Sequence, residues 1–334
     1  MTDINWDTRY HLIGLQKLSK NNQVINLANV LSESNPILAD MPIIQSNEQL
    51  GHTGVRVSSL PTPQIIKVGD GHDASKAEWD PFTESISLFK DRIDIPRDAL
   101  RFQPNKGIDE YRRIRDLHEE GFGQGVANHL IYGTSVSNPE KFNGLAVRYN
   151  TPDATNPISV TNGDYGVYDM AGTGSDTSSI WLIQWDKGKV CGICPLNDPH
   201  MGLRVEDKGL NYKTAENSKL REDFRTELEW DLGLLVNDYR AVARIRNIES
   251  ALSNIDTTLW KKIVEARNNF KGQATVWLYC SPQIYTHLDI MTADKMNVHY
   301  SSDNPWGQRM LMFRDMPIRK CDAILNEETA VAAA

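Results

Sequence analysis

The stretch IDEYRRIRDLHEEGFGQGVANHLIY, residues 108–132, is the segment that decides the fold. Apolar residues recur in it at steps of three and four from Ile108 to Leu130, a spacing that predicts one long helix. The apolar face moves around the helix axis along its length, so we expect different elements to cover its two halves. Gly121, Gly123 and Gly125 interrupt the pattern. Each costs about 1 kcal/mol relative to alanine in a helix, which favours a bend or a break there.

The residues before this helix favour extended structure. In the first 44 residues, Asn35-Pro36 and Met41-Pro42 interrupt any periodic pattern, so we expect an arm that packs on something else, such as a neighbouring chain. Residues 45–84 are rich in Gly, Ser, Pro and Asp and fit an extended loop, with strands expected at 55–59 and 65–68. Ser85–Ile95 follows as a strand with a register break.

The residues after the helix alternate between strands and a compact C-terminal unit. Two strands at 180–185 and 190–195 flank Asp186-Lys-Gly-Lys and predict a hairpin, and two further strands are expected around 226–234 and 241–246. Antiparallel strands with one solvated face fit this pattern best. From 256 onward the signals predict a helix ending before Gly272, a strand at 274–280, a helix opening at Ser281-Pro282, and a strand pair at 309–313 and 317–325. The fold class is therefore α+β.

Composition limits the classes of protein that this chain can belong to. At ~150 residues per domain, 334 residues suggest two domains, and 40% hydrophobic residues suffice for a folded core. The net charge of −8 argues against a protein whose main task is to grip nucleic acid. The longest apolar runs, such as Val276–Cys280, are far too short for a bilayer, and the acidic start is unlike a secretion signal. Four cysteines do not form a disulfide framework, which favours reduced thiols in a cytosol.

No catalytic, cofactor-binding or metal-ligating residue is predicted, and so no enzyme activity. Cys191-Gly-Ile-Cys194 has the spacing of a thiol-redox or zinc site, but it lies in a predicted strand, where residues three apart point to opposite faces. Buried thiols are the expectation, and a thiol-redox or zinc enzyme using Cys191 and Cys194 stays as the alternative. Gly121–Gly125 lies within a helical pattern and does not form a phosphate-binding loop, and Asp70, His72 and Asp73 fit a solvated turn.

Several motifs resemble the major capsid proteins of tailed double-stranded DNA phages, in particular the epsilon-fifteen-like group. They occur in the expected order from about residue 45 to residue 328, and the ordered set is far more specific than any one motif. The residues concerned are Leu60-Pro-Thr-Pro63 through Phe82-Thr-Glu-Ser85, Asp94–Leu100, Phe142-Asn-Gly-Leu145 with Arg148, Thr177–Leu182 with Gly192-Ile-Cys-Pro195, Leu228-Glu-Trp230 with Gly233-Leu, Asp238-Tyr-Arg240 with Arg244-Ile245, Val276-Trp-Leu-Tyr, and Phe313–Asp322. Cys194 departs from the family, where such hairpins usually carry an aliphatic or aromatic residue.

The resemblance implies the Johnson fold (Hong Kong ninety-seven type) and a division of the chain into four parts. These are an N-terminal arm at 1–44, an extended loop at 45–84, a mainly peripheral domain at 85–250 with a spine helix at about 108–132, and an axial α/β domain at 251–334. Part of 142–176 is open to either domain. Some members of this fold cross-link their subunits through a loop lysine, for which Lys76 and Lys67 are the candidates here, but no pocket around them is specified by the sequence.

The function that the resemblance implies is self-assembly into the hexamers and pentamers of an icosahedral head. The implied partners are other copies of the chain, a separate scaffolding protein, a portal and, as an open alternative, a decoration protein. Double-stranded DNA is expected inside the shell without sequence-specific binding, and no membrane is involved. The implied location is the virion, with assembly in the cytoplasm of the host bacterium. A different virion structural protein, such as a decoration or tail component, is the other alternative.

Overall fold

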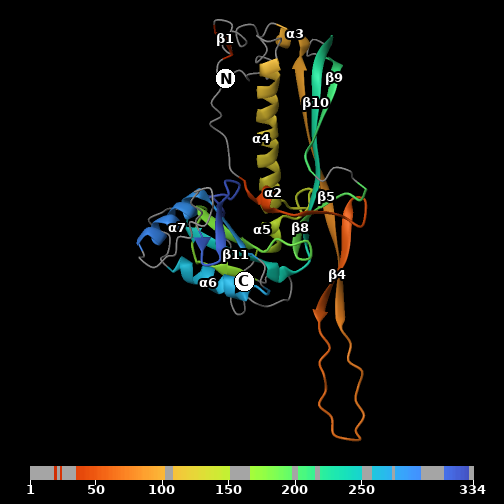
Figure 1. Cartoon of the computed structure of the whole chain (residues 1–334), viewed down its shortest axis with the longest axis vertical. Coiled ribbons are helices and arrows are strands. Elements are labelled where there is room, and N and C mark those ends of the chain that lie inside the picture. Colours follow the sequence, from red (N-terminus) through yellow and green to blue (C-terminus); the bar gives the residue numbers. More distant parts are fainter. Residues whose placement is uncertain are drawn as a thin grey trace, which may run out of the picture. The chain divides into compact units, whose positions relative to one another are not determined.

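Helices and strands occur along most of the chain in the computed structural model (Figure 1). The structure describes residues 19–20, 23–24, 35–101, 108–150, 166–197, 202–214, 219–249, 258–272, 275–294 and 312–330. The chain divides into two compact units. Unit 1 contains Leu88–Val126 and Gly202–Asp231, and unit 2 contains Ser34–Ser87, Ala127–Met201 and Leu232–Ala334. No helix in the described ranges is long and apolar enough to span a bilayer.

Short and long elements alternate along the chain. The helices are α2 (Ile37–Asp40), α3 (Arg97–Arg101), α4 (Ile108–Tyr132), α5 (Leu145–Arg148), α6 (Leu259–Asn269) and α7 (Pro282–Asp294), with a 3₁₀ turn, η4, at Tyr239–Ala241. The strands are β1 (Ser19–Lys20), β2 (Gln23–Val24), β3 (Ile43–Gln45), β4 (Gly51–Ser59), β5 (Glu78–Pro96), β6 (Val167–Asp169), β7 (Thr177–Ile183), β8 (Val190–Cys194), β9 (Arg204–Thr214), β10 (Leu220–Val236), β11 (Val242–Glu249), β12 (Trp277–Cys280), β13 (Met312–Phe313) and β14 (Met316–Lys320).

Two six-stranded sheets organise these strands. The first has the order β3-β8-β10-β5-β4, with β9 paired to β10 off this path, and the second has the order β13-β14-β12-β7-β11-β6. The predicted hairpin is therefore wrong as a pairing: β7 and β8 belong to different sheets, and only an isolated bridge joins Asp186 to Val190. β10 and β11 also belong to different sheets, although both were predicted as strands at these positions.

Helix α4 is one continuous helix of the predicted length, so the break expected at its glycines does not occur. In unit 1 its side chains Tyr111, Ile114 and Phe122 pack on a core from β5, α3 and β10. The buried residues of that core are Ile93, Ile95, Leu100 and Leu228. In unit 2, the last part of the helix buries Ala127, Leu130 and Ile131 completely. Different cores cover the two halves, as the shifting apolar face predicted.

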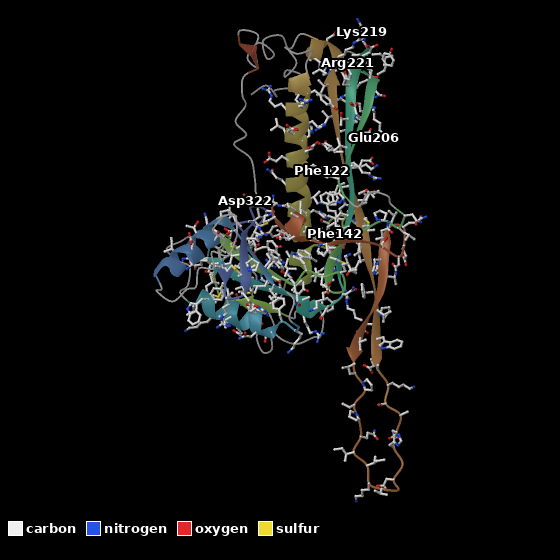
Figure 2. All side chains as sticks on the ribbon, in the orientation of Figure 1. Phe122, Phe142, Glu206, Lys219, Arg221 and Asp322 are labelled. Carbon is white, nitrogen blue, oxygen red and sulfur yellow. The ribbon has the colours of Figure 1, made fainter. Side chains whose placement is uncertain are left out.

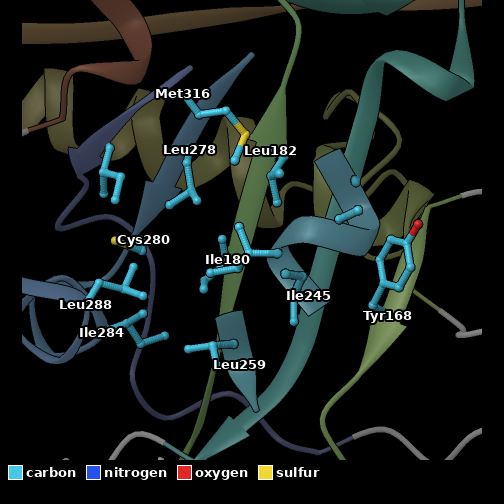
Figure 3. Packing of buried hydrophobic residues seen from close by; sticks show 14 of the residues in the cluster. Tyr168, Ile180, Leu182, Ile245, Leu259, Leu278, Cys280, Ile284, Leu288 and Met316 are labelled. Atoms are coloured by element: carbon cyan, nitrogen blue, oxygen red, sulfur yellow. The ribbon is translucent and has the colours of Figure 1, made fainter. Parts of the chain in front are cut away.

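The main core of unit 2 lies on one face of the second sheet, where α6 and α7 cover it (Figure 3). Ile180 and Leu182 of β7, Ile245 of β11 and Leu278 of β12 meet the helix residues there. The helices contribute Leu259, Ile263, Ala266, Ile284 and Leu288. α6 ends as predicted, with Gly272 just beyond it at φ +90°, a conformation that glycine adopts without strain. α7 begins at Pro282 as the Ser281-Pro282 signal predicted.

The expected loop before the spine helix contains a long antiparallel ribbon. β4 pairs with the first half of β5, from Gly51 opposite Ser85 to Ser59 opposite Glu78. Residues 60–77 form no strand, so the strand expected at 65–68 is wrong, and β4 finds its partner further along the chain. The register break in β5 is present, because Ile86 and Ser87 are buried in succession. The sequence pattern placed Ile86 and Leu88 on one face, but Leu88 is 53% exposed and only Ile86 is buried.

Two glycines, Gly121 inside α4 and Gly144 just before α5, give a test of the local packing. A Cβ built on Gly121 meets no atom within 4 Å, whereas one on Gly144 would lie 2.8 Å from the Ile131 carbonyl oxygen. Gly121→Ala should therefore stabilise the unassembled chain by roughly 0.5–1 kcal/mol, since alanine loses less backbone entropy in a helix. Gly144→Ala should destabilise it, because backbone must move. Urea unfolding of both variants measures the two changes, and stabilisation by Gly144→Ala would contradict the packing described here.

Candidate assembly surfaces

An exposed ribbon is the most distinctive surface of unit 2. β4, β5 and residues 60–77 carry seven large apolar side chains with high exposure: Val55, Val57, Leu60, Ile65, Ile66, Val68 and Trp79. Every residue from 60 to 80 is exposed, and the side chains of residues 60–77 have no other segment beside them in Figure 2. The chain of unit 2 leaves this apolar surface uncovered. Contiguous exposed apolar surface on a folded protein marks a contact site.

The base of the ribbon is fixed by one buried carboxylate. Glu84 of β5 accepts two hydrogen bonds of 2.6 Å from Arg148, the last residue of α5. Arg56 of β4 donates a third to the same carboxylate at 3.3 Å. A bidentate arginine–carboxylate pair fixes orientation as well as charge. The ribbon is therefore attached to α5 at a defined angle by groups shielded from water, since the Glu84 side chain is only 10% exposed.

Arg56 also stacks between two aromatic rings. Its guanidinium carbon lies 3.7 Å from the centre of the Phe82 ring and 4.4 Å from that of Tyr239. Its Nη1 donates to the Tyr239 hydroxyl at 2.8 Å. The Phe82 ring crosses β4 at Gly54, where a Cβ would come within 2.5 Å of it. Gly54 is therefore needed for the close approach of the Phe82 ring to β4. Through Tyr239, the stack also connects the ribbon to the turn between β10 and β11.

The C-terminal residues of unit 2 are held by a second buried carboxylate. Glu328 accepts a 2.8 Å hydrogen bond from Arg244 of β11 and further ones from Ser179 and Tyr132. Burial, together with the neighbouring Glu328 carboxylate, raises the pKa of Tyr132, so its hydroxyl stays a donor. The backbone of Glu328 also bridges to Thr177 at the start of β7. One side chain thus joins the end of α4, two strands and the C-terminal segment.

Residues 35–50, which directly precede β4, are integrated into unit 2. Asn35 accepts a 2.9 Å hydrogen bond from the backbone of Ala323, and Ile37 is fully buried. Asp40 accepts a 2.8 Å bond from the Tyr279 hydroxyl of β12, and β3 pairs in parallel with β8. Residues 1–18, 21–22 and 25–34, most of the predicted arm, lie outside the described residues. The part of the predicted arm after residue 34 contributes to a core.

In unit 1, ion pairs cover the face of β5, β9 and β10 that does not pack against α4. Lys90, Arg204 and Glu229 form one group, and Asp94 with Arg225 and Lys213 forms another. Burial raises the pKa of Asp94, but hydrogen bonds from Arg225 and Lys213 outweigh it and lower the pKa below its usual value. Glu206 on β9 and Arg221 on β10 belong to the same charged strands (Figure 2). Opposite charges alternate here, so this face offers no basic surface for phosphates.

The cysteines are placed for packing and not for chemistry. All four are buried. Burial raises the pKa of Cys191 to about 12, which leaves almost no thiolate at neutral pH. Cys194 lies against the Ile44 carbonyl oxygen at 3.4 Å, and Cys191 lies against that of Lys187 at 3.6 Å, so the two thiols have separate contacts. These surroundings do not favour a thiol-redox enzyme at Cys191 and Cys194.

The other predicted polar groups do not meet at a common site. Asp70, His72 and Asp73 are exposed in the segment 60–77, with the Asp73 backbone donating to Gln64. Within the described ranges, no three His, Cys, Asp or Glu residues are placed to hold a metal ion. Gly121, Gly123 and Gly125 lie inside α4, away from any strand-to-helix turn. That the chain uses no cofactor or catalytic residue stays a prediction.

Comparison with known proteins gives matches to capsid proteins over most of the chain. The family model described as "Major capsid protein GP7" matches residues 19–332. A chain from the structure of bacteriophage Epsilon15 superposes with a TM-score of 0.69 at 22% identity, covering 96% of both chains. The bacteriophage JBD30 capsid superposes with a TM-score of 0.50 at 10% identity, covering 88% of this chain and 93% of that one. No curated protein matches the sequence. The α+β fold described above is thus shared with phage capsid structures.

The contribution of the buried Glu328 network to stability can be tested, with the neighbouring Glu327 as a control. Glu328→Gln should destabilise the unassembled chain by roughly 3–5 kcal/mol, because Arg244 is left buried without its counter-ion. Glu327 is exposed, and Glu327→Gln should change the free energy of unfolding by less than about 0.5 kcal/mol. Chemical unfolding followed by circular dichroism measures both. Equal effects of the two substitutions would show that the network does not hold the C-terminal segment.

Proposed function

The chain belongs to the major capsid protein GP7 family, and from this premise we propose that its copies assemble into the hexamers and pentamers of an icosahedral phage head. The single observation that supports this most directly is the family match over residues 19–332. A capsid protein of this family has a structural, non-enzymatic role. Its place is the shell of the virion, and we propose that it assembles in the cytoplasm of the host bacterium.

We propose that the parts of the chain take the roles of the Johnson fold. Residues 1–44 form the arm, 45–84 the extended loop, 85–250 mainly the peripheral domain with α4 as its spine, and 251–334 the axial domain. The helix-covered core that includes β12, α6 and α7 supports an axial α/β unit. The exposed ribbon of β4 and β5 supports an extended loop that lies across neighbouring copies.

The driving force that we propose is burial of apolar surface between copies. Interfaces above about 2,000 Å² are typical of obligate assemblies, and a chain that exposes a long apolar ribbon gains from such burial. We propose a separate scaffolding protein, a portal and, as an open alternative, a decoration protein as further partners. The net charge of −8 and the ion-paired sheet of unit 1 fit a lining that encloses double-stranded DNA without gripping its sequence.

Assembly is tested by sedimentation. We expect the purified chain, alone or with the scaffolding protein of its phage, to form fast-sedimenting particles as its concentration rises, because apolar contacts between copies are favoured by mass action. Negative-stain microscopy of the fast fraction should show closed shells. Protein that stays monomeric at high concentration, with and without scaffold, would refute the proposed function.

Non-covalent contacts alone should hold the particle together. Cross-linking through Lys76 or Lys67 would need a buried carboxylate to take the lysine proton. Both lysines lie in the exposed segment 60–77, and neither forms an ion pair among the described residues. Particles boiled in denaturant should therefore run as a single band near 37.7 kDa. A ladder of covalent oligomers that disappears in Lys76→Ala particles would contradict this prediction.

A further inference from the structure

The exposed segment 60–77 contains the dipeptide Asp70-Gly71. It lies at the end of a turn in which the backbone N–H of Asp70 donates a 3.1 Å hydrogen bond to the Lys67 carbonyl oxygen. Both residues of the dipeptide are exposed, and the backbone N–H of Gly71 has no hydrogen-bond partner among the described residues. A Cβ built on Gly71 meets no atom within 4 Å. No contact therefore keeps the Asp70 side chain away from the backbone nitrogen of the next residue.

An aspartate and a glycine placed in this way react with each other within the chain. The Gly71 nitrogen attacks the side-chain carboxyl carbon of Asp70 and forms a five-membered succinimide ring, while the proton of the nitrogen and the hydroxyl of the carboxyl group leave as water. One water molecule then opens the ring. Cleavage of the new bond restores aspartate, whereas cleavage of the original peptide bond gives isoaspartate. Water is the only reactant besides the chain itself, and glycine favours the attack because it has no Cβ beside the nitrogen.

We propose that Asp70-Gly71 is a modification site, at which isoaspartate accumulates in the folded chain. In isoaspartate the backbone continues through the side-chain carboxyl carbon, so the main chain becomes one atom longer and the former main-chain carbonyl group becomes a free carboxylate. The turn between Lys67 and Asp70 therefore changes shape in each modified copy, while the charge of the chain stays the same. The inference does not depend on the proposed function, because it uses only the exposure and the hydrogen bonds of this segment.

A second sequence of the same kind is protected by the fold. Asparagine before glycine forms the same ring with loss of ammonia, and in an unfolded chain it reacts faster than aspartate, because an amide is a better electrophile than a carboxylate. In Asn143-Gly144, however, the Gly144 nitrogen donates a 2.8 Å hydrogen bond to the Gly133 carbonyl oxygen. The Asn143 side-chain oxygen accepts two bonds of 2.9 Å from Ser135. Reaction there requires local opening of these bonds, so folding reverses the order of reactivity of Asp70 and Asn143.

Peptide mapping tests this proposal. The full-length unassembled chain is kept at neutral pH, either folded or in guanidinium chloride, and samples are digested with trypsin at intervals, with a digest at time zero as the background. Peptide 68–76 and its isoaspartyl isomer have the same mass and separate by chromatography, and fragmentation distinguishes Asp70 from Asp73. In the folded chain, isoaspartate at Asp70 should form about tenfold faster than Asn143 deamidates, because Asn143 reacts only after local opening. In the denatured chain Asn143 should react first. Asn162-Gly163, which lies outside the described residues, is in a different peptide.

Gly71→Ala is the matched variant. Gly71 does not adopt the positive φ that favours glycine, and the added Cβ meets open space, so the unfolding midpoint should stay that of the native chain. The same Cβ hinders the attacking nitrogen, and isoaspartate at Asp70 should form about tenfold more slowly. Equal rates in the native and Gly71→Ala chains would overturn the proposal. A folded chain in which Asn143 reacts before Asp70, or in which Asp70 stays unmodified while the denatured chain reacts, would overturn it as well. Failure of the native chain to form shells would refute the proposed function and leave this inference unaffected.

Discussion

Glu84 holds two arginines that reach it from different parts of the chain, and the exposed ribbon depends on this arrangement. Arg56 is on the strand paired with it, and Arg148 ends the short helix α5. A carboxylate with this little access to water is stable as an ion only with such partners, because desolvation strongly disfavours an isolated charge. The same group therefore satisfies its own electrostatic requirement and sets the direction of the ribbon. Removing Arg148 would leave the Glu84 carboxylate with only the 3.3 Å hydrogen bond from Arg56, and α5 would no longer be attached to the ribbon by this pair.

A second buried arginine–carboxylate network holds the C-terminal segment of unit 2. Glu328 meets Arg244, Ser179 and Tyr132 in a buried network, and Arg244 also donates to the Tyr149 carbonyl oxygen. Both networks join segments that are far apart in the sequence to the central strands. Apolar packing on the opposite face of the second sheet supplies the bulk of the core. The polar networks add directional contacts, which apolar burial by itself does not provide.

The sequence predicted where helices and strands lie better than it predicted which strands pair. α4 occupies 108–132 and α6 and α7 occur where their patterns placed them, because helical periodicity and caps are local signals. Pairing is not local: Asp186-Lys-Gly-Lys is a hairpin signal, yet β7 and β8 enter different sheets, since each finds a better partner further along the chain. The Glu84 and Glu328 networks had no sequence signal, because their members are up to 196 residues apart. The composition of residues 45–84 predicted an extended loop, and the motif resemblance added its expected role in assembly.

The burial of all four thiols has a consequence for the lifetime of the particle. If the chain assembles in the host cytoplasm, as we propose, its thiols pass from a reducing to an oxidising medium on release. Oxidation of cysteine proceeds through the exposed thiolate, and Cys191 is both inaccessible and protonated at neutral pH. A shell built from this chain therefore presents the same chemistry before and after release from the cell.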